Sequence, residues 1–316
     1  MTNGVEKSGD GTWERELVTR LATAALKEQR RARLWGIFFK LLAFGYVALV
    51  LLMAVDWKRD GVSGKKHTAM VELSGLIAPG NDASAERITG ALQAAFKDKN
   101  TQGVVVRINS PGGSPVQAQT IYDEMKRLRK KYPEIPLYAV VEDICASGGY
   151  FVAAGADRIY VGKASIVGSI GVLMNGFGFT GLMEKLGIER RLITAGENKG
   201  MLDPFSPLDE KDKAHAKLLM GEIHQQFIGV VREGRGKRLK ETPEIFSGLI
   251  WTGQKSIELG LADGIGSLES VAREVVNAED IVDFTQKEGL AEKFAKRFGA
   301  AAAGAIVESL LRASLR

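Results

Sequence analysis

The chain has 316 residues, with 43 Lys or Arg against 38 Asp or Glu, so its formal net charge is +5. Hydrophobic residues make up 45% of the chain and charged residues 26%, which excludes a disordered chain, a collagen-like or coiled-coil rod and a membrane protein with several spans. The mild excess of positive charge does not indicate a nucleic-acid partner, and the single cysteine, Cys145, excludes an internal disulfide framework and a thiolate zinc cluster.

An apolar run near the N-terminus predicts a membrane anchor. The run reads WGIFFKLLAFGYVALVLLMAV from Trp35 to Val55, and Lys40 is its only charged residue. A helix of this length rises by roughly 30 Å, which matches the thickness of a bilayer core. Because the run shows no polar face, a membrane span is favoured over a buried core helix. We therefore expect one transmembrane helix at residues 35–56.

Composition divides the rest of the chain into a tail, a linker, a body and a C-terminal segment. Residues 1–34 form a polar, partly helical tail, and the basic residues just before the apolar run favour its placement in the cytoplasm. The tail is long and carries acidic residues, which argues against a cleaved signal peptide. Residues 57–66 are expected to be a linker, 67–285 a globular body outside the cytoplasm, and 286–316 an amphipathic helical segment for packing, assembly or membrane-surface contact.

The body alternates strand-like and helix-like segments. Continuous apolar or β-branched runs predict strands at 69–77, 103–108, 137–141 and 158–161, and an apolar, glycine-punctuated run follows at 166–172. Helical spacing predicts helices at 84–97, from Ser114-Pro115 onward, and at 151–156. This alternation favours an α/β fold with a parallel sheet.

Two glycine-rich turns follow buried strands and carry the residues best suited to chemistry. The first turn reads RINSPGGS at 107–114, and the second reads DICASGGY at 143–150. Backbone amides at such corners can bind an oxyanion, and acyl transfer needs both a nucleophile and oxyanion donors. We therefore assign Ser147 as the candidate nucleophile, with the amide of Gly148 and an amide from Gly112 and Gly113 as the candidate oxyanion hole.

Other interpretations of these turns stay open. Taken alone, the Ser-Gly-Gly sequence also fits a serine that only caps a helix. Ser110 and Ser114 are weaker candidates for the nucleophile, since Ser110 precedes a proline, which favours extended backbone, and Ser114 is explained as a helix cap. Cys145 is expected to be a small buried residue, and Glu142 and Asp143 are expected to be solvated or capping.

A serine nucleophile needs a base, and the three histidines fit this role poorly. His67 is expected in the linker by the membrane, and His215 and His224 lie on a long helix with a polar face, where solvent exposure is expected. The alternative is a lysine whose pKa is lowered by burial. Lys199, in AGENKGMLDPF, has apolar neighbours that could desolvate its amine, although its spacing also fits an ordinary surface lysine.

Taken together, these motifs resemble the signal peptide peptidase A family over residues 67–270. The resemblance rests on five segments in the family's order: RINSPGG at 107–113, ASGGY at 146–150, AxxVGSIGV at 164–172, AGENKG at 195–200 and WTGQKSIELGLAD at 251–263. It implies an α/β fold of the Clp-protease/crotonase-like type, a spiral of ββα units, preceded here by one transmembrane helix.

The resemblance also implies a mechanism. It implies a Ser–Lys dyad of Ser147 and Lys199, with Ser169 hydrogen-bonded to the lysine amine, although Asn198 stands where many relatives carry an aromatic residue. It implies a homo-oligomeric ring in which a site can combine the serine and lysine of adjacent protomers. The implied activity is that of a serine endopeptidase in a bacterial-type inner membrane, which degrades cleaved signal peptides and other extended, membrane-proximal peptides without a cofactor.

Two other functions stay open on the sequence. A crotonase-like acyl-CoA enzyme also uses paired glycine turns as an oxyanion hole, but the anchor and the expected extracytoplasmic side, where CoA is absent, argue against it. A non-catalytic ring that scaffolds membrane proteins is the second alternative. The sequence shows no metal-ligand spacing and no phosphate loop, so neither a metal nor a cofactor is expected.

Overall fold

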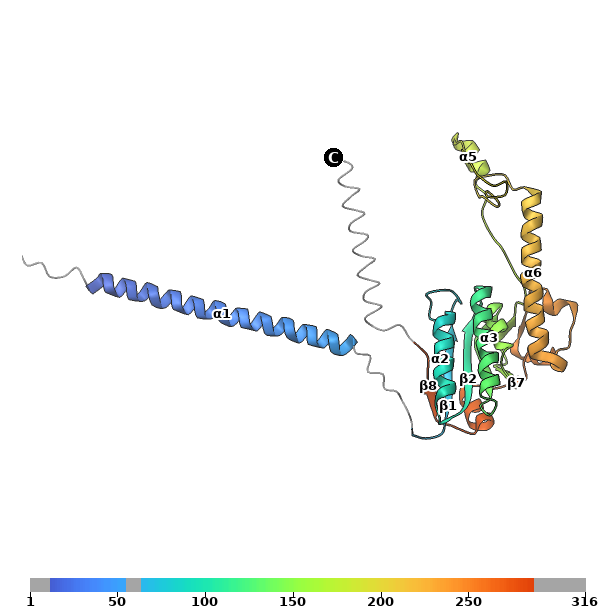
Figure 1. Cartoon of the computed structure of the whole chain (residues 1–316), viewed down its shortest axis with the longest axis horizontal. Helices are drawn as coiled ribbons and strands as arrows, with labels where there is room; N and C mark the ends of the chain where they lie inside the picture. Colours follow the sequence, from blue (N-terminus) through green and yellow to red (C-terminus); the bar gives the residue numbers. More distant parts are fainter. Residues whose placement is uncertain (1–11, 55–63, 287–316) are drawn as a thin grey trace, which may run out of the picture. The chain divides into compact units, whose positions relative to one another are not determined.

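The computed structural model describes residues 12–54 and 64–286, and the chain divides into two compact units. The first unit is described through α1 (Thr12–Ala54), one continuous helix (Figure 1). The side chains described for it, within residues 15–49, are almost all exposed. Within the described residues, α1 is the one helix long and apolar enough to cross a membrane. It contains most of the predicted span and part of the predicted tail. The linker up to residue 63 and the predicted C-terminal helical segment after residue 286 lie outside the described residues.

The second unit is built on a mixed sheet, which has eight strands within residues 64–286. The strands are β1 (His67–Ser74), β2 (Thr101–Ser110), β3 (Leu137–Ala146), β4 (Arg158–Val161), β5 (Ile166–Gly168), β6 (Ile250–Thr252), β7 (Gly264–Ile265) and β8 (Ile281–Asp283). The main path runs β6-β5-β3-β2-β1-β8; off this path, β4 pairs with β3 and β7 pairs with β4. All pairs are parallel except β5 with β6, which confirms the predicted α/β class.

Helices connect the strands of the second unit. They are α2 (Ala85–Lys97), α3 (Pro115–Lys131), α4 (Gly148–Ala153), α5 (Thr180–Leu186), α6 (Glu210–Arg235), α7 (Gly253–Glu258) and α8 (Leu268–Val271). Figure 1 shows α2 and α3 side by side along the central strands. Ser114 accepts a hydrogen bond from the amide of Gln117 and Pro115 occupies the first turn, so the predicted helix start is confirmed.

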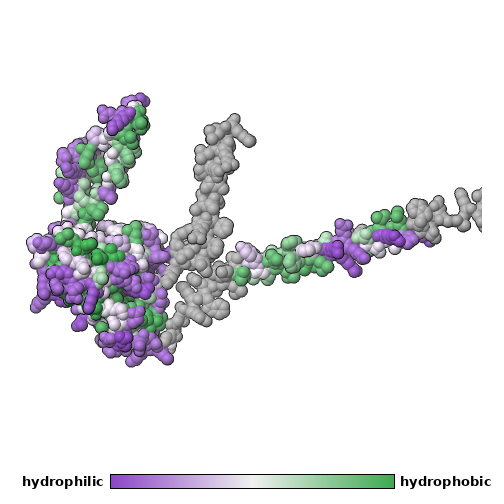
Figure 2. Space-filling view, turned by 180° about the vertical axis from the view of Figure 1, so that it is seen from behind, coloured by the Kyte–Doolittle hydropathy of each residue, from purple (hydrophilic) through white to green (hydrophobic). Residues whose placement is uncertain are grey.

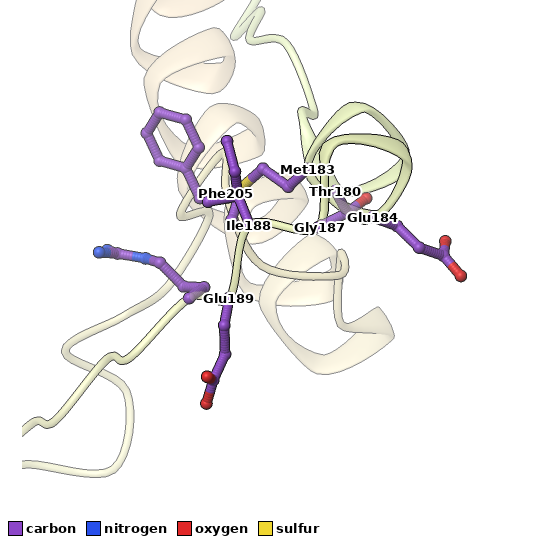
Figure 3. Close-up of a pocket in the computed structure, with 8 residues that line it drawn as sticks. Thr180, Met183, Glu184, Gly187, Ile188, Glu189 and Phe205 are labelled. Atoms are coloured by element: carbon purple, nitrogen blue, oxygen red, sulfur yellow. The ribbon is translucent and has the colours of Figure 1, made fainter.

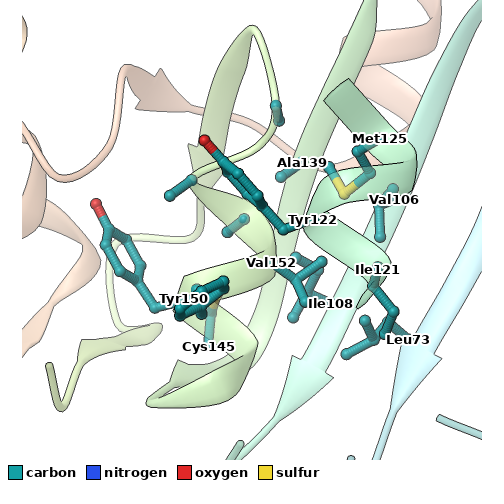
Figure 4. Packing of buried hydrophobic residues seen from close by; sticks show 14 of the residues in the cluster. Leu73, Val106, Ile108, Ile121, Tyr122, Met125, Ala139, Cys145, Tyr150 and Val152 are labelled. Atoms are coloured by element: carbon teal, nitrogen blue, oxygen red, sulfur yellow. The ribbon is translucent and has the colours of Figure 1, made fainter. Parts of the chain in front are cut away.

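The main hydrophobic core lies between the sheet and helices α2, α3, α4 and α6 (Figure 4). Ile108 of β2, Ile121 and Met125 of α3, and Tyr150 of α4 are fully buried there. Each such side chain contributes roughly 1.5–3 kcal/mol by its removal from water. The hydroxyl of Tyr150 donates a hydrogen bond of 2.7 Å to the carbonyl oxygen of Leu261, so the core contains this polar group without an unmet hydrogen bond.

β3 changes partners part of the way along its length. Val141 pairs with Val161 of β4, whereas Cys145 pairs with Val167 of β5. The register with β2 also shifts between these two positions of β3, which marks an irregularity of the β-bulge type. Bulges bend a strand and change the direction in which the next residues point. The second glycine turn begins directly after this bent strand, at the end where β5 has replaced β4.

Residues 171–209, which we call the arm, connect β5 to α6 and extend away from the sheet (Figure 1). Many of its apolar side chains are exposed, among them Leu173 at 80%, Phe177 at 81% and Ile193 at 95%. Figure 2 shows this hydrophobic surface on the projecting segment. Exposed apolar surface of this extent on one segment marks a site of interaction rather than a random surface composition.

Two histidines differ from the sequence-based expectation. His67, expected in the linker by the membrane, is the first residue of β1. It is fully buried and its ring stacks on that of Phe284, with centroids 6.0 Å apart. His224, expected on a solvated helix face, is half-buried and its Nε2 donates a hydrogen bond of 3.1 Å to the carbonyl oxygen of Ile170. Both expectations were wrong because strand pairing and helix docking enclose these residues.

Candidate active site

Ser147 occupies a strained turn between β3 and α4. Its backbone has φ 52 and ψ −123, a conformation that costs a residue other than glycine roughly 1–3 kcal/mol. Its amide donates to the carbonyl oxygen of Gly168 and its carbonyl oxygen accepts from the amide of Phe151, both at 2.9 Å. Its side chain makes no capping hydrogen bond and is partly exposed. The helix-cap interpretation of this serine therefore fails, and its hydroxyl is available for chemistry.

The two glycine turns meet beside this hydroxyl. The carbonyl oxygen of Gly112 accepts from the amide of Ile77 at 2.9 Å, which anchors the first turn to the end of β1. A Cβ atom on Gly112 would lie 2.7 Å from both the amide nitrogen of Gly148 and the Cβ of Ser147. A Cβ atom on Gly148 would lie 3.2 Å from the amide nitrogen of Gly113. The amides of Gly113 and Gly148 thus lie close together next to Ser147.

Of the three glycines predicted for the oxyanion hole, Gly112 differs from the other two. Its amide donates to the Oγ of Ser110 at 3.1 Å, and this Oγ in turn donates to the carbonyl oxygen of Gly75 at 2.6 Å. Among the residues that the structure describes, no acceptor is found for the amides of Gly113 and Gly148. These two amides are available to an oxyanion. Gly112 has a different role, because its lack of a side chain allows the two glycine turns to approach each other.

The weaker candidates around the turns have structural roles. Ser110 is fully buried with its hydroxyl engaged, and Ser114 caps α3. Cys145 is fully buried in the core, and burial raises the pKa of its thiol, as expected for an inert packing residue. Asp143 is exposed and accepts a hydrogen bond from the Nδ2 of Asn109 at 3.3 Å. None of these groups competes with Ser147 for the role of nucleophile.

Ser169 lies next to Ser147 across the sheet. Ala146 pairs with Gly168 in the parallel register of β3 and β5. Each of the two serines directly follows one residue of this pair, so they lie at the ends of neighbouring strands. Ser169 also has a positive φ, of 53, and its amide donates to the carbonyl oxygen of Leu249 at 2.7 Å. Its hydroxyl has no hydrogen-bond partner within residues 64–286. Two strained serines with free hydroxyls therefore lie side by side.

Lys199 is not part of this cluster in the single chain. It lies on the arm, in a turn closed by a 3.1 Å hydrogen bond from its own amide to the carbonyl oxygen of Gly196, and it is exposed. Within the described part of the chain, no hydrogen bond joins it to Ser147 or Ser169. The structure thus brings together Ser147, Ser169 and the two glycine amides, and it leaves Lys199 apart.

The arm nevertheless has an ordered framework of its own. The rings of Phe179 and Phe205 stack with centroids 5.4 Å apart. Asp203 accepts a 2.8 Å hydrogen bond from the hydroxyl of Ser206 and pairs with Arg190 at 3.3 Å, and these contacts hold the pKa of Asp203 below its usual range. A shallow, open surface pocket of about 410 Å³ is lined by α5 and Phe205 (Figure 3). Lys199 is therefore carried by a folded segment rather than by an unstructured loop.

Sequence reasoning missed the position of His224, although a signal was present. Phe227 and Ile228 follow it at helical spacing, and both are buried against the body. A histidine three and four residues before two buried apolar residues lies on the same face of the helix. His224 was therefore predictable as a residue of the docked face of α6.

Comparisons with known proteins agree with this geometry. A model of peptidase family S49 matches residues 129–281, and a model of the Clp protease family matches residues 69–166. The first match includes both Ser147 and Lys199, and the second includes both glycine turns. The fold is thus a Clp-protease-like α/β fold, as the resemblance implied.

Individual relatives cover different shares of their own length. A Brucella abortus protein named Na(+)/H(+) antiporter NhaA is 44% identical over 209 residues, which cover 65% of this chain and 28% of that protein. A putative signal peptide peptidase SppA of Enterococcus faecium is 30% identical over 235 residues, or 72% of this chain and 67% of that protein. A putative protease of Methanocaldococcus jannaschii is 30% identical over 267 residues, or 80% and 85%. The chain therefore spans less than a third of the Brucella relative and most of the other two.

Proposed function

Because the chain belongs to peptidase family S49, the family of signal peptide peptidase A, we propose that it is a membrane-anchored serine endopeptidase. The observation that carries the proposal is the meeting of the two glycine turns at Ser147. This arrangement combines a free hydroxyl, on a strained backbone, with two amides that have no acceptor within the described residues. Acyl transfer needs these parts, a nucleophile and preorganised oxyanion donors.

In the proposed mechanism, Ser147 attacks the scissile peptide bond. The neutral amine of Lys199 takes the proton from the Ser147 Oγ as this oxygen bonds to the substrate carbonyl carbon. The amides of Gly113 and Gly148 donate hydrogen bonds to the oxyanion that forms. Lys199 then gives its proton to the leaving amine. In the second half, Lys199 takes a proton from water as the water oxygen bonds to the acyl carbon, and the Ser147 Oγ leaves and receives this proton. Ser169 orients the lysine amine with its free hydroxyl.

To act as a base, Lys199 needs a second copy of the chain that buries its amine. A lysine serves as a base at neutral pH only where burial lowers its pKa from about 10.4. In the single chain Lys199 is exposed on the arm. We therefore place the complete site between copies in a homo-oligomeric ring, where the arm of one copy brings Lys199 to Ser147 of the next. The exposed Leu173, Phe177 and Ile193 of the arm support such a contact.

Signal peptides left in the membrane are the substrates that fit this site. Apolar, exposed side chains flank the turn on both sides: Leu76 and Val116 near Gly113, and Leu249 and Ile250 near Ser169. They suit the apolar segment of a signal peptide in extended form. The α1 helix supports an anchor in a bacterial-type inner membrane, with the N-terminus in the cytoplasm and residues 67–285 outside. An anchor of this kind would raise the effective concentration of peptides held in the same bilayer.

The proposal is tested by cleavage of synthetic signal peptides with the full chain in detergent micelles. Wild type, Ser147→Ala and Lys199→Ala are compared by mass spectrometry of the products and by sizing of each assembly. Lys211→Ala is the matched control, since Lys211 is also exposed and pairs with Glu197 near the lysine turn. We expect cleavage by wild type and the control, and none by the two site variants in an intact assembly.

Mixing the two inactive variants tests whether the site is shared between copies. If the serine and the lysine come from adjacent copies, co-assembly of Ser147→Ala with Lys199→Ala restores part of the activity. If Lys199→Ala alone retains activity, the base lies elsewhere. If an assembled wild type cuts no peptide and resists a serine-directed fluorophosphonate, the scaffold and acyl-CoA alternatives take precedence.

A further inference from the structure

We propose that His224 is a positioning residue that holds Ser169 in place beside the nucleophile. The inference rests on the proposed function, because the effect of Ser169 on catalysis belongs to that mechanism. His224 lies in the middle of α6, and its Nε2 donates to the carbonyl oxygen of Ile170, the residue directly after Ser169. This hydrogen bond does not involve the hydroxyl of Ser147 or of Ser169. His224 therefore acts on Ser169 through the backbone.

Within residues 64–286, three hydrogen bonds beyond the regular strand pairing hold the backbone around Ser169. The carbonyl oxygen of Gly168 accepts from the amide of Ser147 at 2.9 Å, and the amide of Ser169 donates to the carbonyl oxygen of Leu249 at 2.7 Å. The third is the 3.1 Å bond from His224 to the carbonyl oxygen of Ile170. The first two join backbone to backbone. His224 is therefore the side chain through which mutation can loosen this restraint.

The restraint is needed because the backbone of Ser169 is strained. Its φ of 53 is unfavourable for a residue with a Cβ atom. Such a conformation persists only where surrounding contacts over-determine it. Loss of one of the three bonds allows the peptide units around Ser169 to rotate towards ordinary φ values. The hydroxyl of Ser169 then moves relative to Ser147, whose own amide is bonded to Gly168.

His224 also joins Ile170, the residue before the arm, to the middle of α6, the helix that follows the arm. Ile170 is fully buried at the point where the chain leaves the body, and α6 is the helix by which the chain returns. The bond between them closes the base of the segment that carries Lys199. The same contact thus restrains two parts of the proposed mechanism. One is Ser169, which orients the lysine amine, and the other is the arm, which carries Lys199.

The test compares His224→Leu with His224→Gln in the full chain. Leucine has a similar volume but no donor, whereas glutamine carries an amide N–H at about the reach of Nε2. His215→Gln is the matched control, because His215 lies on the same helix and is exposed. Each variant is assayed for kcat and KM on an apolar fluorogenic peptide, for inactivation by a fluorophosphonate, for assembly by sizing, and for amide hydrogen exchange of residues 166–172.

We expect His224→Leu to lower kcat about tenfold or more, since small misplacements of reacting groups are costly in rate, while KM changes little. The exchange of the Ser169 amide rises in the same variant. His224→Gln recovers kcat to within about threefold, and His215→Gln resembles wild type in every readout. An intact assembly in all variants separates this effect from a general loss of structure.

The proposal is overturned if His224→Leu keeps the wild-type kcat, if glutamine fails to rescue it, or if its loss of activity follows a loss of assembly. Hydrogen exchange keeps this result distinct from a failure of the proposed function. If Ser147→Ala is as active as wild type, the proposed serine mechanism is wrong. Separately, if amide exchange at Ser169 is unchanged in His224→Leu, the positioning role of His224 is wrong, whatever the activity of Ser147→Ala.

Discussion

A methyl group at position 112 would enter the contact between the two glycine turns. In Gly112→Ala the new Cβ would lie 2.7 Å from the amide nitrogen of Gly148 and from the Cβ of Ser147, and 2.9 Å from the carbonyl oxygen of Ala146. The backbone also has φ +101 at this position, which side chains rarely adopt. Strain of about 1–3 kcal/mol and a similar cost of overpacking together predict a destabilisation of roughly 2–6 kcal/mol.

The same substitution is expected to impair catalysis beyond its effect on stability. To relieve the clash, the amide of Gly148 must move away from the position it needs to donate to the oxyanion. Loss of one oxyanion donor typically costs about 10²–10³ in kcat. Thermal unfolding of the full chain in detergent micelles measures the stability, for which we expect Tm to fall by at least roughly 4 °C. Peptide cleavage below that temperature measures kcat on the folded fraction.

Gly221→Ala provides the matched control for this experiment. Gly221 lies within α6, and a Cβ there would meet nothing within 4 Å, so alanine should stabilise the helix by about 1 kcal/mol. The two substitutions are chemically identical and have opposite expected signs. If Gly112→Ala keeps both the wild-type Tm and the wild-type kcat, the turns do not meet as described and the assignment of the oxyanion hole is wrong.

Three further predictions concern the fold and the assembly. Asp263→Asn should destabilise the chain by about 3–5 kcal/mol in thermal unfolding, because it removes the negative charge 2.9 Å from the buried guanidinium of Arg235. Burial opposes ionisation of Asp263, but the hydrogen bond and charge of Arg235 hold its pKa below the usual range. The stability that the Asp263 carboxylate provides should therefore be complete above about pH 4 and be lost as pH falls through the lowered pKa. Iodoacetamide should label Cys145 only after unfolding, since the thiol is fully buried and burial raises its pKa, and labelling of the native chain with loss of activity would contradict its packing role. Ile193→Asp should leave Tm unchanged, because this side chain is 95% exposed, but should break the assembly in sizing experiments; an unchanged assembly would remove the arm from the interface.

Local patterns in the sequence were sufficient for individual parallel strands and for the start of a helix. The strand predicted at 158–161 coincides with β4 (Arg158–Val161), and the predicted helix after Ser114 begins with the expected cap. The meeting of the two glycine turns was also within reach of the sequence. Each turn follows a buried parallel strand, and the carboxyl ends of neighbouring parallel strands share one edge of the sheet.

Features that depend on contacts far apart in the sequence could not be predicted in the same way. The change of β3 from β4 to β5 is a matter of register, which a run of apolar residues does not reveal. The burial of His67 depends on its contact with Phe284, more than 200 residues away. The pairing of Ser147 with Lys199 stays a prediction.

The left-handed backbone at Ser147 also restricts which amino acid can serve as the nucleophile. Threonine carries a hydroxyl of similar reactivity, but its second Cβ substituent crowds the backbone, and β-branched residues are outliers at a φ of 52. Serine has the same oxygen without the branch. At this corner the choice between the two hydroxyl amino acids is therefore made by the conformation of the main chain, before any difference in their chemistry comes into effect.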